Sequence, residues 1–195
     1  MTPKMKFVIE HLEVELFPWC LLEYEQMSSY VGKENLLFTK VPLKDHKKLK
    51  KFGEVTQKSI LELNYKKTCL LDPKATKIFL PSDSKQFDYF IFGGILGDHP
   101  EQGRTEKYLT SKLKNTSLRN LGNKQMSTDT AVLATKLILD GKNFEKLSFQ
   151  DDLEVNIKNG TIKESLLLPY RYILINKKIQ INPKLIDYLK KKKSL

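Results

Sequence analysis

The sequence predicts an α/β protein built on a mainly parallel, open sheet. The first observation is a series of short apolar runs that stop abruptly, as strands buried on both faces of a sheet do. The second is a pair of glycine turns, at Gly93-Gly94 and at Gly122, which lie about thirty residues apart. Each turn follows a strand-like run and precedes a helix-like segment. This is the spacing of a βαβ unit, in which both strands point the same way.

Length and composition favour one folded domain, residues 1–195, with 40% hydrophobic and 29% charged residues. Lys and Arg number 34 against 23 Asp and Glu, which gives a formal net charge of +11. Such a charge favours contact with RNA, the ribosome or another acidic surface. The excess is mostly lysine, however, so a lysine-rich proteome or solubility explains it equally well. Arg104, Arg119 and Arg171 are too few for an arginine cluster that reads bases.

The scarcity of cysteine and histidine excludes several classes of site. Two cysteines, Cys20 and Cys69, are too few for a disulfide framework, which favours a reducing compartment. The three histidines form no zinc motif, so we expect no metal. No apolar segment is long enough to cross a bilayer, and the N-terminus does not resemble a secretion signal. We therefore predict a cytoplasmic protein without a membrane partner.

The first half of the chain predicts alternating strands and helices. A strand over 6–11 ends where Glu10, His11, Glu13 and Glu15 crowd together, and a helix runs from Pro18 to Gly32. Two further strands are expected at 35–40 and 68–71. The lysine-rich segment 43–67 indicates a solvated surface helix, which we favour over an RNA-binding arm.

The stretch from Phe87 to Pro100 contains the strongest site signal. Its aromatic strand stops at Gly93-Gly94, which allow a ligand close to the main chain, and Asp98 places a carboxylate just beyond. A plain turn after a buried strand is an equally good interpretation of this stretch alone. The glycine spacing matches neither a dinucleotide fingerprint nor a P-loop.

The second half predicts a helix over 102–113, a strand over 116–121 and a helix from Ser127 or Thr128 to Gly141. Strand-like runs between 147 and 180, with a tight turn at Asn159-Gly160, indicate an added antiparallel hairpin. A short helix from Pro183 closes the chain. Residues 147–195 are thus expected to form a hairpin and helix extension within the single domain.

Taken in order, these motifs resemble those of the SPOUT methyltransferases with a C-terminal trefoil knot. The match is carried by FDYFIFGGILGDHP with Arg104-Thr105 and by LGNKQMSTDTA from Leu121, with support from IEHLE, CLLDPKAT and LPYRYI. It is closest to the branch typified by the yeast SPOUT-type protein arginine methyltransferase that modifies a small-subunit ribosomal protein. The segment 43–67 and the shortened turn 101–103 depart from that pattern.

The resemblance implies a deep trefoil knot, a rare exception to the rule that chains do not thread loops. It also implies S-adenosyl-L-methionine as cofactor, held by main-chain groups of two loops. The first wall would be Gly93, Gly94, Ile95, Leu96 and Gly97, and the second Leu121, Gly122, Gln125, Met126, Thr128 and Thr130. Leu96 and Met126 would pack against adenine; ordinary core packing is the alternative.

The implied substrate is an arginine in a ribosomal protein of the small subunit. Because a guanidinium stays protonated in water, a carboxylate must orient it and accept a proton. Asp98 is the first choice for this role, with Glu10 and Glu13 as second choices and His11 and His99 as orienting groups. Asp98 could instead cap a helix. Arg104 could pair with Asp98, with the cofactor carboxylate or in a surface salt bridge.

Two other functions compete with this one. A SPOUT enzyme acting on ribosomal or transfer RNA suits the positive charge, and a ribosome-associated binding protein without activity is the third interpretation. The acidic groups Glu10, Glu13, Glu15 and Asp98 favour a cationic protein substrate, because they would repel a phosphate backbone. Both a monomer and a homodimer are compatible with the sequence.

Overall fold

A computed structural model of the protein describes residues 5–96, 103–158 and 164–192. Its centre is a six-stranded sheet with the order β3-β2-β1-β5-β4-β6, and every pairing in it is parallel. The strands are β1 (Lys6–His11), β2 (Leu36–Thr39), β3 (Glu54–Val55), β4 (Thr68–Leu71), β5 (Tyr89–Gly94) and β6 (Ser117–Arg119). The predicted parallel, open sheet is therefore confirmed, with β1 and β4 at the predicted bounds.

The two glycine turns do not follow neighbouring strands, because β4 lies between β5 and β6. Gly93 and Gly94 also belong to β5 itself, since they pair with Glu10 and His11 of β1. The glycines thus extend the strand that they were expected to end.

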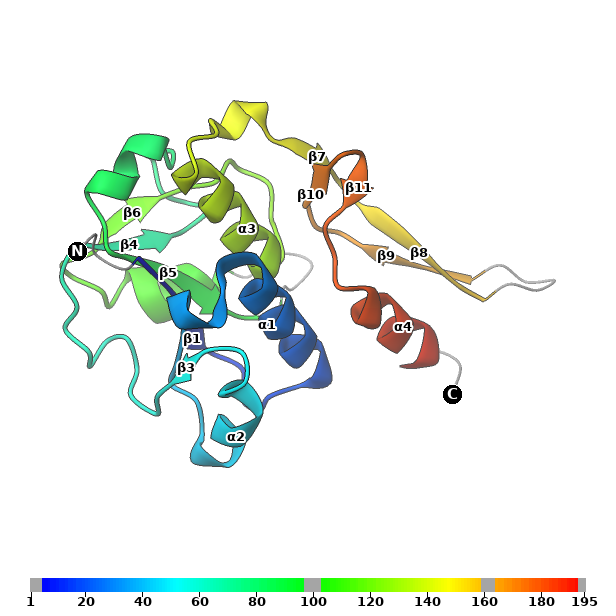
Figure 1. Ribbon diagram of the computed structural model, residues 1–195, viewed down its shortest axis with the longest axis horizontal. Helices are drawn as coiled ribbons and strands as arrows, with labels where there is room; N and C mark the ends of the chain where they lie inside the picture. Colours follow the sequence, from blue (N-terminus) through cyan, green and yellow to red (C-terminus); the bar gives the residue numbers. More distant parts are fainter. Residues whose placement is uncertain (1–4, 97–102, 159–163, 193–195) are drawn as a thin grey trace.

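Alternating side chains give the sheet two buried faces. Phe7 and Ile9 of β1, with Phe90 and Phe92 of β5, pack in the core cluster that includes α1 (Pro18–Val31) and α3 (Thr128–Leu139). These two helices lie side by side over the sheet (Figure 1). Val8, Leu70 and Ile91 face the other side, together with Ile60 and Leu109. Both helices end as predicted, near Gly32 (φ 79°) and Gly141 (φ 99°), where glycine tolerates a left-handed backbone.

Two predicted helices are wrong in extent. The segment 43–67 contains only a 3-10 turn (Leu43–Asp45) and a four-residue helix, α2 (His46–Leu49), followed by the short strand β3, which pairs with β2. Between residues 44 and 53, all of them described, Leu49 and Phe52 are the only large apolar side chains, too few to hold a long helix on the core. From Gly103 on, the other helix is reduced to two helical residues and a π-helical turn (Glu106–Thr110).

The C-terminal part adds antiparallel structure, as predicted. β7 (Ser148–Gln150), β10 (Tyr172–Ile175) and β11 (Lys178–Ile179) form one small sheet, and β8 (Leu153–Lys158) pairs with β9 (Glu164–Leu168). These strands and α4 (Pro183–Lys192) extend to one side of the main sheet (Figure 1). Their apolar side chains pack against Trp19 and Leu22 of α1. The turn at Asn159-Gly160 lies outside the described residues. The trefoil knot and the single-domain boundaries remain predictions.

Candidate active site

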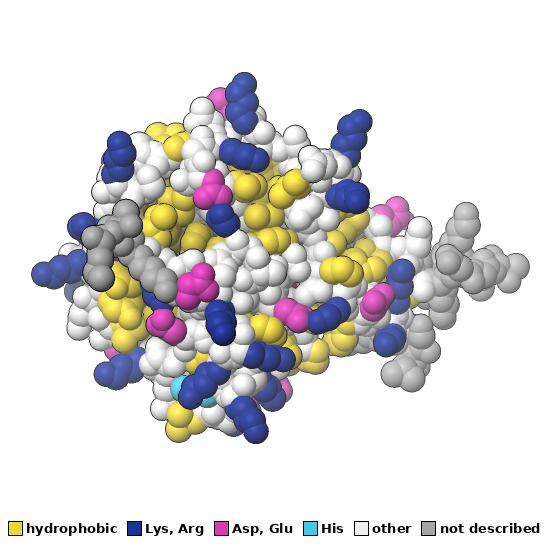
Figure 2. Space-filling model, viewed as in Figure 1, with side chains coloured by type: hydrophobic (Ala, Val, Ile, Leu, Met, Phe, Trp, Pro, Cys, Tyr) yellow, Lys and Arg dark blue, Asp and Glu magenta, His cyan; other side chains and the backbone are white. Residues whose placement is uncertain are grey.

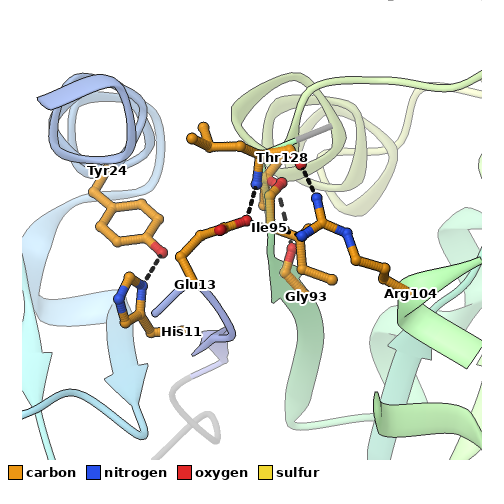
Figure 3. Close-up of polar contacts among 8 residues, drawn as sticks. His11, Glu13, Tyr24, Gly93, Ile95, Arg104 and Thr128 are labelled. Atoms are coloured by element: carbon orange, nitrogen blue, oxygen red, sulfur yellow. Dashed lines mark hydrogen bonds and ion pairs between the residues drawn. The ribbon is translucent and has the colours of Figure 1, made fainter. Parts of the chain in front are cut away.

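The chain after β1 and the chain after β5 are joined at the carboxyl edge of the sheet. The Leu12 N–H donates to the Gly94 carbonyl at 3.1 Å, and the Leu96 N–H donates to Glu13 Oε1 at 2.8 Å. Arg104 donates to the same Glu13 oxygen at 3.3 Å and also to the Leu96 carbonyl. Figure 3 shows Glu13 and Arg104 approaching this loop from opposite sides. Both main-chain polar groups of Leu96 are therefore held by charged side chains, and Arg104 pairs with Glu13.

The second predicted wall lies beside the first. The Thr128 hydroxyl is 3.3 Å from the Gly93 carbonyl oxygen and 3.5 Å from that of Ile95 (Figure 3). Thr130 is buried, and its hydroxyl accepts a hydrogen bond from Ser127. The start of α3 is thus bonded directly to the end of β5.

A small cavity of about 60 Å³ adjoins the second wall. Its lining combines apolar side chains with a glycine backbone: Leu71, Asp72, Pro73, Leu121, Gly122, Lys124, Met126 and Ala131. Aromatic rings are bound in such surroundings, with specificity supplied by a few polar groups. The lining is therefore compatible with the predicted adenine site.

Neighbouring protein atoms leave no room for a side chain at Gly94 or Gly122. A Cβ on Gly94 would lie 2.6 Å from the Tyr24 hydroxyl and 2.9 Å from Cγ2 of Ile9. Gly122 has φ of 82°, and a Cβ there would lie 2.9 Å from the Phe144 ring. The close approach predicted at Gly94 and Gly122 exists, but in the described structure the approaching groups are side chains of the core.

The remaining second-wall residues are held through the main chain. The Gln125 carbonyl accepts the Arg171 N–H at 2.9 Å, and Met126 forms a parallel bridge with Arg171. The Arg171 side chain donates to Asp151 at 2.7 Å, and Lys124 bonds the other oxygen of that carboxylate at 2.5 Å. These hydrogen bonds lower the pKa of Asp151 to about 2. The C-terminal extension thereby supports the second predicted wall.

Glu10 is buried, and both of its carboxylate oxygens are engaged. Oε2 accepts from the Thr39 hydroxyl and, at 2.9 Å, from the Ile60 N–H, while Oε1 accepts from the Ser59 hydroxyl. These bonds connect β1 with β2 and with the chain before β4. Its catalytic role stays a prediction, whereas the contacts are those of a structural carboxylate.

His11 is buried beside Tyr24, whose hydroxyl lies 2.9 Å from Nδ1 (Figure 3). Burial lowers the pKa of His11, although the carboxylate of Glu13 opposes the shift. The imidazole is therefore neutral at pH 7. Of the other predicted site residues, Gly97, Asp98 and His99 lie outside the described residues.

Residues 6–194 match the family described as "Protein arginine N-methyltransferase SFM1-like". The chain belongs to this family. It is 38% identical to the protein arginine N-methyltransferase SFM1 of Saccharomyces cerevisiae over 205 residues, covering 96% of this chain and 95% of that protein. The crystal structure of yeast SFM1 complexed with SAM superposes with a TM-score of 0.87 at 37% identity, covering 98% and 92% of the two chains. The complex with SAH gives 0.85 at 37%, covering 94% of each.

A more distant likeness concerns the fold alone. The crystal structure of the dual-specific Trm10 from Thermococcus kodakaraensis superposes with a TM-score of 0.61 at 16% identity, over 73% of this chain and 96% of that one. The predicted resemblance to the arginine methyltransferase branch of the SPOUT enzymes is confirmed by the family match and by the likeness to yeast SFM1.

Two buried carboxylates in this SFM1-like chain were missed by sequence reasoning. Glu23 of α1 accepts a hydrogen bond from Trp19 Nε1 at 2.7 Å, and Asp129 of α3 has one oxygen without a partner among the described residues. Burial raises the pKa of Glu23 well above its usual value, and the nearby Asp129 adds to the shift. Burial also raises the pKa of Asp129 to about 6. The sequence contains one indication that Glu23 is buried, because Glu23 lies next to Tyr24 on the apolar face of α1.

The described residues contain no group of three or more His, Cys, Asp and Glu side chains arranged to hold a metal ion. Within the same ranges, no helix combines the length and the hydrophobicity needed to cross a membrane.

Proposed function

We propose that this protein transfers a methyl group from S-adenosyl-L-methionine to an arginine side chain of a ribosomal protein of the small subunit, in the cytoplasm. The observation that carries the proposal is the meeting of two loops and a carboxylate at one sheet edge, where Glu13 holds Leu96 and Thr128 contacts Gly93. The yeast relative, named as an arginine methyltransferase and crystallised with SAM and with SAH, supports it.

The residues that would hold the cofactor are those of the two walls. Leu121, Met126 and Ala131 provide apolar lining beside the backbone of Gly122, which suits the adenine. Leu96 packs at the edge of the same core cluster, and its backbone is fixed by Glu13 and Arg104. When bound, the cofactor supplies an electrophilic methyl group on its sulfonium.

The remaining steps, which are to orient the substrate guanidinium and to accept its proton, are carried out by side chains of the protein. A nitrogen–carbon bond forms as the carbon–sulfur bond breaks, and the modified nitrogen must lose a proton. We assign acceptance of this proton to Asp98. Glu13 Oε2 makes no hydrogen bond with the described residues, so this oxygen can receive a guanidinium N–H while Oε1 holds Leu96. His11 is too deeply buried to touch a substrate and acts by positioning the chain that leads to Glu13.

Charge at the rim of the site favours a protein substrate over RNA. Glu15 is exposed and follows Glu13 in the segment that borders the first wall, together with the exposed Val14. Carboxylates at this edge attract a basic peptide and repel phosphates.

The test of substrate class uses ribosomes from cells that lack the enzyme. The protein is incubated with them and a methyl donor labelled on the methyl group, and the product is digested separately with protease and with nuclease. Label released by protease alone is expected. Label released by nuclease alone would show that RNA is the substrate, and no label on either would support the inactive binding protein.

Two substitutions separate chemistry from cofactor binding. Asp98→Asn should keep the affinity for S-adenosyl-L-homocysteine in calorimetry while losing most turnover. Ala131→Leu should fill part of the 60 Å³ cavity and weaken that affinity, with an unchanged circular dichroism spectrum as the control for folding. Unchanged turnover of Asp98→Asn would remove Asp98 from the mechanism. Normal affinity of Ala131→Leu would show that the adenine binds elsewhere.

A further inference from the structure

A second, larger hollow of about 510 Å³ lies away from the candidate active site. Thr68, at the start of β4, and Thr116, just before β6, lie at one end, and Ile60 and Ile91 form part of its apolar lining. The residues that carry the argument are Tyr65, Lys66, Lys67, Lys112 and Lys114. We call this hollow the lysine groove. Its volume is in the range of sites that bind small molecules.

Most of the positive charge of the lysine groove is uncompensated by the described residues. None of its lining residues is acidic. Lys67 lies 3.6 Å from Asp88, but Lys66, Lys112 and Lys114 are exposed and make no ion pair in the described part of the chain. Lys112 only approaches the Tyr108 ring, at 5.9 Å from its centroid. Several cationic groups therefore face one hollow without counterions from the described protein.

Net charge alone would not locate a binding surface on this protein. Figure 2 shows Lys and Arg side chains scattered over the face that it draws rather than gathered in a single patch. The lysine groove differs because its cations surround a concave space that also offers an aromatic ring and the side-chain amides of Asn64 and Asn115. The hydroxyls of Thr68 and Thr116 bond to each other at 2.8 Å.

The lysine groove and the candidate active site lie at opposite ends of the same strands. β4 begins in the groove at Thr68 and ends at Leu71, which lines the cofactor cavity, about 10 Å further along. Ile60 and Ile91 belong to the sheet face opposite α1 and α3. A ligand in the groove would therefore leave the cofactor walls open.

We propose that the lysine groove binds single-stranded RNA, which is held there without being methylated. Ammonium groups bind backbone phosphates as point charges, and an exposed aromatic ring stacks on a base of any sequence. Tyr65 lines the groove while its ring stacks on Tyr89 at 4.1 Å between centroids, so the ring is held in place for such a contact. Lysine ammonium groups bind phosphates and stacking accepts any base, so these contacts do not select a sequence. The groove would keep the enzyme on an RNA-rich particle while the other edge of the sheet acts on protein.

Binding is measured by fluorescence anisotropy of a labelled oligouridylate of about 15 nucleotides between about 50 and 200 mM salt. The triple variant Lys66→Gln, Lys112→Gln, Lys114→Gln is compared with Lys33→Gln, Lys44→Gln, Lys142→Gln, which removes the same charge from exposed sites outside the groove. Each lost phosphate contact makes the plot of the logarithm of the association constant against the logarithm of the salt concentration less steep by about 0.7. Loss of three contacts in the groove variant should therefore reduce the steepness by about 2. At low salt this variant should bind the RNA at least about tenfold more weakly than the wild type.

The control variant should change both quantities much less. Equal losses in the two triple variants would overturn the proposal, since binding would then follow net charge and not the groove. Polyglutamate that competes as well as RNA would instead identify an acidic protein as the occupant.

Tyr65→Leu should weaken RNA binding without changing its salt dependence, and unaltered affinity would show that Tyr65 does not stack on a base. Methyl transfer to protein by the groove variant should remain normal, which separates this result from failure of the proposed function.

Discussion

The buried carboxylate pair of Glu23 and Asp129 makes stability depend on pH in an unusual direction. Burial raises the pKa of Asp129 from 3.8 to about 6, so the folded protein holds this proton more tightly than the unfolded chain does. The contribution of protonated Asp129 to the free energy of unfolding is fully present below about pH 4 and is lost as the pH rises to about 6. Since one pKa unit corresponds to about 1.4 kcal/mol, the loss amounts to about 3 kcal/mol. The raised pKa of Glu23 acts in the same direction.

Asp129→Asn removes the charge and keeps the shape of the side chain. At pH 8 the variant should therefore be more stable than the wild type by up to about 3 kcal/mol, which raises the melting temperature by about 6–12 °C for a chain of this size. At pH 4 the two proteins should unfold together. Urea unfolding followed by circular dichroism at pH 4, 6 and 8 measures the difference, in which contributions from groups that do not interact with Asp129 cancel. Glu23 does interact with it, so the measured gain includes relief of Glu23 from the Asp129 charge.

The matched control is Asp152→Asn, at an exposed position with φ of 53°, a conformation that both residues tolerate. Because water surrounds this exposed carboxylate, the stability of Asp152→Asn relative to the wild type should change much less with pH than that of Asp129→Asn. The reasoning would be refuted if Asp129→Asn gained no stability over the wild type between pH 4 and pH 8.

Two further predictions concern the core. Gly94→Ala should destabilise the fold by about 1–3 kcal/mol, because its Cβ would lie 2.6 Å from the Tyr24 hydroxyl; adding Tyr24→Phe should restore part of the loss in thermal unfolding, and no recovery would contradict the contact. Burial raises the pKa of both Cys20 and Cys69 to about 12, so the native protein at pH 8 should react only slowly with Ellman's reagent and the urea-unfolded protein at once. Fast, complete labelling of native protein would show that the thiols are accessible.

Residues at the ends of the elements that position the site were sufficient to predict these elements from the sequence. Pro18 and Gly32 bound α1, and Ser127 and Gly141 flank α3, because each residue has a backbone preference that acts without help from the rest of the fold. The apolar run after Tyr89 likewise identified β5.

The parts that sequence did not predict depend on distant partners. β3 has two residues and exists through its pairing with β2, so no periodicity could reveal it. Glu10 resembles a site carboxylate because it ends a strand, yet its bonding partners Ser59 and Ile60 come from a segment without recognisable pattern. The meeting of Glu23 with Asp129 likewise requires α1 and α3 to be packed together.

The contacts of Arg171 have a consequence for how the chain can be shortened. Its backbone and side chain connect the loop around Gln125 with Asp151, so the C-terminal strands act as a brace behind the proposed methyl-donor pocket. Removal of everything after residue 147 would leave Lys124 without its carboxylate and Gln125 without its hydrogen-bond donor. A truncated chain would thus be expected to fail in donor binding before it failed in folding of the parallel sheet, which makes the tail an integral component of the catalyst.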